Sequence, residues 1–484
     1  MASHISDTPS LPDPPLGHIP SNTTPVLSCN MEHPATGSAD SNPVTFEKEA
    51  WVPLLLHLQL PLPTVAGVLQ GKLATWGVEE RGIHPVAVED RTETHFIKIF
   101  FVWFSANTNI LSFSTGTLGP VVFGLGLRDS CLVILFFNLL CAIPPAYLYY
   151  GTMVPSLFSL VLGLGFSVLN SILGGQALAT IANISWSVGI VIIAVTSLFI
   201  SFCGLKVLNW YENCAWIPAF IVFIIVAGVG GKDFVDVPAP PATAAQILDF
   251  AAVMAGFTLT WGTFSSDYTA YFNPRVSSRR NIGFCGAQLE EGYTDGNVGG
   301  LLNAMLSPLG GFGKFLVVLL CLSVTATVSP TTYSMCMAIQ TLIPPMVGVP
   351  RYVFSVAATA LVIVLAIVGQ HRFYSALSNF LGIIGYWAGA WVAAICVEHL
   401  YFRKGDFSLY DIQYWNVPSK LPLGAAALGA SILSFALVIP SMSQVWYTGP
   451  IAHTTGDIGF EFAFALTALF YIPLRHVEKR VRGF

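Results

Sequence analysis

Apolar segments long enough to cross a lipid bilayer recur along this chain of 484 residues. A spanning helix needs about 20 consecutive apolar residues. Only 10% of the chain is charged, whereas soluble domains carry roughly 25%. The sequence therefore predicts an all-α polytopic membrane protein. We count about eleven spans, at residues 98–129, 131–150, 153–182, 186–204, 214–231, 244–271, 315–343, 351–370, 376–400, 421–441 and 457–474.

The first of these spans is interrupted near its middle by small and polar residues. In lipid, a break in a helix is tolerated where it lines a cavity inside the protein, and the ends of two half-helices can hold a polar ligand or a cation. Small residues also let membrane helices pack closely, which is the alternative interpretation. We expect the break between Ser112 and Gly119. The interrupting residues are Asn107, Asn109, Ser112, Ser114, Thr115, Gly116, Thr117, Gly119 and Pro120.

The sixth span, 244–271, is interrupted in the same way, between Gly256 and Tyr268. Two broken spans that lie five helices apart are typical of secondary transporters built from inverted repeats, in which the substrate binds near the middle of the membrane. The sequence therefore predicts a transporter with its site between these two breaks.

Composition also predicts how the chain divides. Residues 1–95 are rich in Ser, Pro and Thr at their start and charged towards their end, which predicts a cytosolic and largely disordered N-terminal tail. Residues 96–475 form the predicted transmembrane domain. Residues 476–484 are predicted to be a short basic tail in the cytosol.

Positive charges test the number of spans, because Lys and Arg are enriched in cytosolic loops. With a cytosolic N-terminus, six spans return Arg275, Arg279 and Arg280 to the cytosol. Only three spans separate Arg280 from Arg403, and an odd number places these groups on opposite faces. We therefore expect that one crossing is missing, or that residues 281–313 supply a poor one.

Several other classes of protein find no support in the sequence. It has no clustered basic face of the kind that binds nucleic acid, and no nucleophile–base pair, metal-ligand cluster or phosphate loop that would indicate an enzyme. None of the nine cysteines forms a CxxC pair, so we expect free thiols and no metal or other cofactor.

Six strings resemble the fungal purine-cytosine permeases of the nucleobase-cation-symport-1 family. The resemblance runs from about residue 72 to the end of the chain. The strings are 112–130 (SFSTGTLGPVVFGLGLRDS), 169–176 (LNSILGGQ), 265–268 (SSDY), 379–387 (NFLGIIGYW), 398–403 (EHLYFR) and 415–424 (WNVPSKLPLG).

This resemblance implies a LeuT-like fold of twelve helices, in which two inverted five-helix repeats carry broken first and sixth helices. It further implies proton-coupled import of nucleobases across the fungal plasma membrane by alternating access, with both termini in the cytosol. The expected partners are a small nucleobase and the lipid bilayer, and the coupling ion is H+. Family members carry a further span after the sixth, for which residues 281–296 are too short and too polar.

A nucleobase is a flat ring edged with donors and acceptors, so its site needs an aromatic face and amide or hydroxyl partners. Asn170 lies one helical turn from Phe166, and this pair could read the edge of a base beside a ring. Asn170 could instead bond a neighbouring helix. Trp261, at the sixth-span break, could stack on the base or simply pack in the core. We expect Phe166 and Trp261 to sandwich the ring.

Hydroxyl groups supply the remaining candidates. Ser112 and Ser114 could bond the ligand or cap their own backbone. Thr327 and Thr331 stand where relatives often place asparagines that face the base, and a hydroxyl cannot make the paired contact of an amide. The substrate could therefore be another heteroaromatic compound, such as a vitamin B6-type molecule or a nucleoside, or the chain could be a transport-incompetent remnant or sensor. Ser323 and Thr327 are expected to face the first-helix break, where this architecture holds its coupling cation.

Proton coupling needs a titratable group in or near the membrane, and a carboxylate there indicates function. Asp267, which ends the sixth span, and Glu212, which opens the fifth, are the candidates. Glu212 could alternatively be an interfacial charge beside Lys206. We expect Asp249 to be an exposed helix-start residue and Glu398 to be structural.

Overall fold

The computed structural model describes residues 97–147, 153–230, 240–264, 267, 298–343, 346, 349–406, 409–410, 422 and 424–482. The chain divides after Leu62 into two units, and all of these residues belong to the second, Pro63–Phe484. The predicted tail up to residue 95, the arginines at 275–280 and the region where a crossing is predicted to be missing, up to residue 297, lie outside the described residues.

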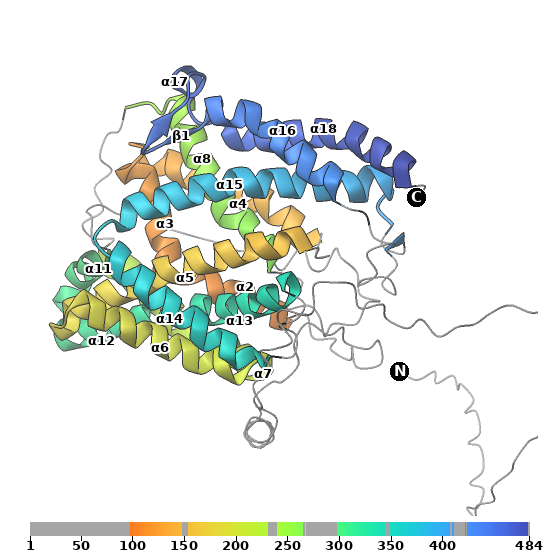
Figure 1. The fold of residues 1–484 in the computed structure, drawn as a ribbon. Helices are drawn as coiled ribbons and strands as arrows, with labels where there is room; N and C mark the ends of the chain where they lie inside the picture. The colour runs from red at the N-terminus through yellow and green to blue at the C-terminus, as the bar shows by residue number, and fades with distance from the viewer. Residues whose placement is uncertain are drawn as a thin grey trace, which may run out of the picture. The chain divides into compact units, whose positions relative to one another are not determined.

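The described part of the chain is almost entirely helical (Figure 1). The elements are α2 (Ile97–Asn107), α3 (Ile110–Val121), α4 (Leu127–Tyr147), α5 (Met153–Ala182), α6 (Trp186–Cys203), α7 (Leu205–Gly230), α8 (Ala244–Leu259), η4 (Thr260–Thr263), α11 (Val298–Leu306), η5 (Ser307–Leu309), α12 (Gly310–Ser323), α13 (Thr325–Leu342), α14 (Arg351–Gly369), α15 (Phe373–Val397), η7 (Glu398–Phe402), α16 (Ala425–Ser441), β1 (Ser443–Gln444), β2 (Tyr447–Thr448), α17 (Ala452–Thr455) and α18 (Gly459–Arg482).

Nine helical segments among the described residues are long and apolar enough to cross a membrane, and α16 is a shorter apolar helix. The helices α2 and α3 are the two halves of the first predicted span. Each predicted span therefore has a helical counterpart, and the chain is an integral membrane protein.

The first helix is broken, but not where the sequence analysis placed the break. Residues 112–119 are helical inside α3, and the break lies at Thr108 and Asn109. Asn109 has an extended backbone, and its side-chain oxygen accepts hydrogen bonds from the N–H groups of Leu111 (2.7 Å) and Ser112 (2.9 Å). This is an N-cap, which satisfies the free donors at the start of α3.

Small residues within α3 serve close packing instead of a break. At Gly119, an added Cβ would lie 2.6 Å from the Ser130 hydroxyl of α4 and 3.0 Å from the ring of Phe250 on α8. The first span also ends earlier than predicted, because α3 stops at Val121 and Gly124 adopts a positive φ of 65°. Arg128 and Asp129 therefore belong to the first turn of α4.

The second break lies where it was predicted. Helix α8 begins with a capping box between Thr243 and Gln246 and ends at Leu259, and the chain then tightens into the short 3₁₀ helix η4. The backbone N–H of Asp267 donates to the carbonyl of Phe264 just after η4 (3.0 Å). A 3₁₀ stretch inside a span often marks a functional site.

Helix α5 lies at the centre of the bundle, in contact with α6, α12, α13, α14 and α15 (Figure 1). Glycines allow the closest of these contacts: a Cβ at Gly175 would lie 2.5 Å from the backbone nitrogen of Ile190 on α6. This central helix carries Phe166 and Asn170, so the predicted site residues lie inside the bundle and not on its lipid-facing surface.

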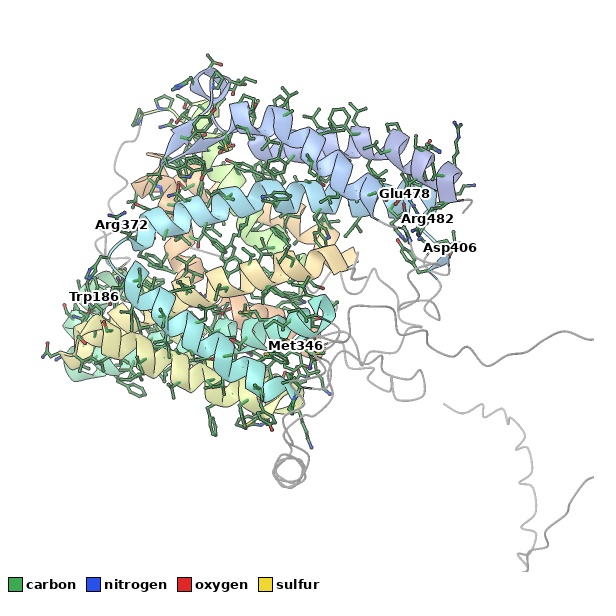
Figure 2. The ribbon with its side chains drawn as sticks, in the orientation of Figure 1. Trp186, Met346, Arg372, Asp406, Glu478 and Arg482 are labelled. Atoms are coloured by element: carbon green, nitrogen blue, oxygen red, sulfur yellow. The ribbon has the colours of Figure 1, made fainter. Side chains whose placement is uncertain are left out.

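Two helix ends differ from the prediction. Helix α7 begins at Leu205, nine residues before the predicted span, and therefore contains Glu212. Helix α18 continues through Arg482, so residues 476–482 extend the helix; their position in the cytosol stays a prediction. In Figure 2, Glu478 and Arg482 lie at the same end of the bundle as Asp406, whereas Trp186 and Arg372 lie at the other.

Candidate functional site

Aromatic rings from four elements meet at the second break. The Trp261 ring in η4 lies 6.3 Å from the Phe166 ring of α5 at an interplanar angle of 22°, and 5.3 Å from the Trp103 ring of α2 in an edge-on contact. Phe380 on α15 contacts Phe166, with its ring edge-on at 5.4 Å. Phe166 and Trp261 are 2% and 6% exposed. The predicted aromatic pair is therefore brought together.

The spacing of this pair does not match the expected sandwich. A ring held between two others needs about 7 Å, which is twice the contact distance of ~3.5 Å between carbon atoms. The observed 6.3 Å is too short. In this conformation a base could stack on one of the rings only if the pair opens, so the sandwich stays a prediction for another conformation.

Asn170 is completely buried one turn along α5 from Phe166. Its side-chain N–H₂ donates to the Phe166 carbonyl (2.8 Å), while its side-chain oxygen has no partner among the described residues. The Ser112 hydroxyl on α3 and the Trp261 indole N–H are likewise buried without a partner in that part of the chain. A buried polar atom without a partner costs about 1–3 kcal/mol, so these atoms are available to a ligand.

Ser114 and Thr331 differ from these residues, because their hydroxyls already donate hydrogen bonds within the protein. Ser114 donates to the carbonyl of Ile110 (2.8 Å), and Thr331 donates to the carbonyl of Thr327 (2.6 Å). Both are bonds within one helix. These two residues could still accept a hydrogen bond from a ligand, but they have no free proton to donate.

Ser323 and Thr327 do face the first-helix break. Thr327 donates to the carbonyl of Ala106 (2.6 Å), and the N–H of Ile110 donates to the Ser323 hydroxyl (3.3 Å). Asn109, which was not predicted as a site residue, donates from its side chain to Ala106 (2.5 Å) and Thr327 (2.8 Å). An Asn just before a helical run is a signal for an N-cap and could have identified it.

Glu212 lies in the third turn of α7 and is 0% exposed. It is therefore buried by protein and is not a charge exposed on the surface beside Lys206. The Ser105 hydroxyl of α2 interacts with this carboxyl group, although no partner among the described residues meets hydrogen-bond geometry with either carboxyl oxygen. Ser105 lies three residues before the break at Thr108 and next to Ala106, whose carbonyl accepts hydrogen bonds from Asn109 and Thr327.

The other carboxylates are tied to neighbouring elements. Asp249 is not a helix-start residue, because Thr243 caps α8; instead its side chain accepts a hydrogen bond from the backbone N–H of Asp457. Glu398 is structural, as expected: it accepts hydrogen bonds from Arg403 (3.2 Å), Arg475 (3.1 and 3.2 Å) and Tyr471 (3.0 Å). Asp267 is half-buried one turn beyond η4.

Two interrupted helices around a buried site of aromatic and unsatisfied polar groups define a secondary transporter. Comparison with known proteins agrees with this class. A family described as permeases for cytosine/purines, uracil, thiamine and allantoin matches residues 85–148. The chain is 33% identical to the purine-cytosine permease fcyB of Emericella nidulans, over 86% of this chain and 92% of that protein. It is 30% identical to the purine-cytosine permease FCY2 of Saccharomyces cerevisiae, over 85% and 88%.

The chain therefore belongs to the purine-cytosine permease family. Its fold is also that of the nucleobase-cation-symport-1 transporter Mhp1, solved in a closed conformation with bromovinylhydantoin bound. The TM-score is 0.59 at 13% identity, covering 83% of this chain and 96% of Mhp1. These findings confirm both the resemblance and the LeuT-like fold class.

Proposed function

We propose that this protein imports purine or cytosine-type nucleobases across the fungal plasma membrane by alternating access, coupled to protons and with both termini in the cytosol. The observation that carries the proposal is a set of buried polar atoms that have no partner among the described residues: the Asn170 oxygen and the Trp261 N–H at the aromatic pair, and the Ser112 hydroxyl on α3. One acceptor and two donors of this kind are complementary to the edge of a base, which presents both N–H donors and acceptors.

Each of these atoms has a distinct role in the proposal. The Asn170 oxygen accepts from a ring or exocyclic N–H, and its position is held by the bond from its own N–H₂ to Phe166. The indole N–H of Trp261 and the hydroxyl of Ser112 donate to a carbonyl or ring nitrogen. Trp261 or Phe166 supplies the stacking face once the two rings separate by roughly 1 Å.

Glu212 is the proposed proton carrier, with Asp267 as the alternative. An unpaired carboxylate inside the membrane is costly, and carboxylates in that position commonly relay protons. Protonation removes this charge. Because Glu212 interacts with Ser105 at the end of α2, a change in its charge acts next to Ala106, whose carbonyl holds Asn109 and Thr327 at the break.

Uptake of radiolabelled cytosine, adenine and pyridoxine into cells that express the chain tests the substrate. We expect accumulation of one of the bases, abolished by a protonophore. Asn170→Ala should raise KM on the order of 10-fold, because it removes a hydrogen bond to the substrate. Thr196→Val, on the exposed side of α6, is the control and should behave as the parent. Absence of uptake by protein that reaches the surface would refute the proposal.

The same assay tests the proton carrier separately. Glu212→Gln preserves the shape of the side chain and removes its titration, so uptake should lose its dependence on external pH. If Glu212→Gln keeps that dependence and Asp267→Asn loses it, the carrier is Asp267. Accumulation of pyridoxine but of neither base would replace the nucleobase with a vitamin B6-type substrate.

A further inference from the structure

The connection between α16 and α18 folds back over two helices of the bundle. It forms the hairpin β1–β2, in which Ser443 pairs with Thr448 and Gln444 with Tyr447, followed by the short helix α17. Figure 1 shows this connection at the N-terminal end of α8 and beside α15. With both termini in the cytosol, as proposed above, it lies on the extracellular side. We call residues 442–458 the outer connection.

A buried carboxylate, Asp457, bonds the outer connection to α15. Asp457 is 2% exposed and lies between α17 and α18. Its Oδ2 accepts hydrogen bonds from the Tyr386 hydroxyl of α15 and from the backbone N–H of Ser443 (3.0 Å). Its Oδ1 accepts from the N–H of Gly459 (2.9 Å). Because one buried side chain joins these elements, its removal leaves several donors without a partner.

The hairpin itself adds further contacts to the same part of α15. Gln444 donates to the Tyr386 hydroxyl (2.6 Å), and the backbone N–H of Val445 donates to the Asn379 side chain (3.2 Å). Gln444 can approach only because residue 382 is a glycine: a Cβ there would lie 2.4 Å from the Gln444 nitrogen. Residues 379–386 of α15 are thus held along their length.

The outer connection also holds α8. The backbone N–H of Asp457 donates to the Asp249 side chain, and Gly456, with a positive φ of 78°, packs against Ala245 so closely that a Cβ would lie 2.5 Å from its Cα. Helix α8 leads directly into η4 and Trp261. The same residue, Asp457, therefore contacts α15, which carries Phe380, and α8, which leads into the break at Trp261.

The part of α15 that is held in this way carries Phe380. Its ring lies edge-on against Phe166 at 5.4 Å, and Phe166 faces Trp261 at a spacing too small for a base. Helix α15 approaches α5 closely here, since a Cβ at Gly165 would lie 2.1 Å from the Phe380 ring. Entry of a base between Phe166 and Trp261 thus requires Phe380 and residues 379–386 to shift.

We infer that the outer connection is a latch over the substrate site, and that Asp457 is the positioning residue that holds Phe380 against Phe166. This inference rests on the proposed function, because it concerns access to the same site. Releasing the latch favours the conformation that is open to the outside and slows the closing step that follows binding. The apparent affinity of a transporter rises with the fraction of molecules in the binding-competent conformation.

Transport kinetics provide the first test. In Asp457→Asn, both KM and Vmax for external substrate should fall, by about 3- to 10-fold each. Tyr386→Phe should change both in the same direction and by less, because it removes one donor to Asp457. The control is Thr467→Val, which removes a buried hydrogen bond of 3.1 Å between α18 and α16 and should leave KM unchanged. A lower Vmax with an unchanged KM in Asp457→Asn would mean a merely structural role and would overturn the inference.

Thiol labelling tests the latch without any need for transport. Intact cells that express Phe380→Cys are treated with a membrane-impermeant maleimide. Labelling of the native cysteines is measured in the chain without this substitution and is subtracted. Asp457→Asn should raise the labelling rate of Cys at this position several-fold, and Thr467→Val should not. Equal rates in all backgrounds would refute the latch even if uptake is normal. A raised rate in a chain that transports nothing would support the latch and refute the proposed substrate.

Discussion

Asn109, at the break between α2 and α3, donates a hydrogen bond of 2.8 Å to the Thr327 hydroxyl of α13, which lies 218 residues later in the chain. The same side chain donates to the Ala106 carbonyl and accepts from two backbone N–H groups of α3. One amide therefore ends the first half-helix, begins the second and ties both to α13. The Asn109 side chain thus satisfies backbone groups on both sides of the break, as the interior of a membrane requires.

Replacing Asn109 should destabilise the protein more than replacing its neighbour Asn107. Asn109→Ala removes an N-cap and two donated hydrogen bonds, with an expected cost of about 2–3 kcal/mol. Asn107→Ala removes one hydrogen bond to Trp103 (2.9 Å), with an expected cost of about 1 kcal/mol or less. Thermal unfolding in detergent measures both. Equal losses would show that the amide does not organise the break.

The two threonines of α13 should differ in importance. Thr327→Val removes the donor to Ala106 and the acceptor for Asn109, so we expect a loss of about 1–2 kcal/mol of stability and slower uptake. Thr331→Val removes only a bond to the carbonyl one turn back on the same helix and should change uptake less than about 2-fold. A large rise in KM for Thr331→Val alone would instead place its hydroxyl in contact with the substrate.

The sequence predicted that the first and sixth helices are broken, and it located the sixth break correctly. It misplaced the first break because composition does not distinguish two uses of small residues. Gly119 serves close packing with Ser130 and Phe250, whereas the break itself depends on the capping geometry of Asn109. The cap itself is local, but the hydrogen bond from Asn109 to Thr327 joins distant parts of the chain and is not revealed by an apolar run.

The candidate site could be predicted to a similar extent. Helical periodicity predicted that Asn170 lies beside Phe166, and the break in the sixth span pointed to Trp261 as a site residue. In the structure, the rings of Phe166 and Trp261 are in contact. Glu212 was assigned to the start of a span because the polar residues before Cys214 lower the local hydropathy. Tertiary packing extends α7 to Leu205 and buries this carboxyl group. The contacts of Asp457 with Asp249 and Tyr386 join distant parts of the chain and gave no local signal.

Substitutions of Trp261 should separate its two contributions to binding. Trp261→Phe keeps an aromatic face and loses the indole N–H, so we expect KM to rise by about 5-fold, the value of one hydrogen bond. Trp261→Ala also loses stacking, which is worth about 1–3 kcal/mol per base, so KM should rise by a further factor of about 5 to 150. Substrate uptake measures both. Identical KM values for the two variants would exclude stacking on this ring.

The ion pair between Glu398 and Arg475 should stabilise the contact of η7, which follows α15, with α18. Two hydrogen bonds of 3.1 and 3.2 Å join the guanidinium to the carboxylate, and their side chains are only 6% and 16% exposed. Arg475→Lys keeps the charge and loses the paired geometry, so we expect a loss of about 1–2 kcal/mol. Arg475→Leu leaves the carboxylate less compensated and should cost about 3 kcal/mol. Thermal unfolding is the measurement, and a melting temperature of Arg475→Lys equal to that of the parent would contradict it.

The outer connection should make stability depend on pH through Asp457. Burial raises the pKa of this carboxyl group above its ordinary value, and the hydrogen bonds from Tyr386, Ser443 and Gly459 only partly oppose this effect. The folded protein therefore holds a proton at this carboxyl group more tightly than the unfolded chain does. The stabilisation of the folded protein by this bound proton is fully present below the unfolded pKa of about 3.9. It is lost as the pH rises through the higher pKa of the folded protein.

The comparison that isolates this effect is the parent against Asp457→Asn, which cannot titrate at this position. The melting temperature of the parent should fall relative to that of Asp457→Asn as the pH rises from about 4. The difference between the two should become constant above the folded pKa of Asp457. Asp249 on α8 and Glu461 on α18 face the same region and interact with Asp457, so Asp249→Asn serves as a second reference. If the parent instead gains stability over Asp457→Asn with rising pH, the hydrogen bonds to the carboxylate outweigh its burial. In that case the pKa of Asp457 is lowered, and the fully ionised group is what stabilises the outer connection.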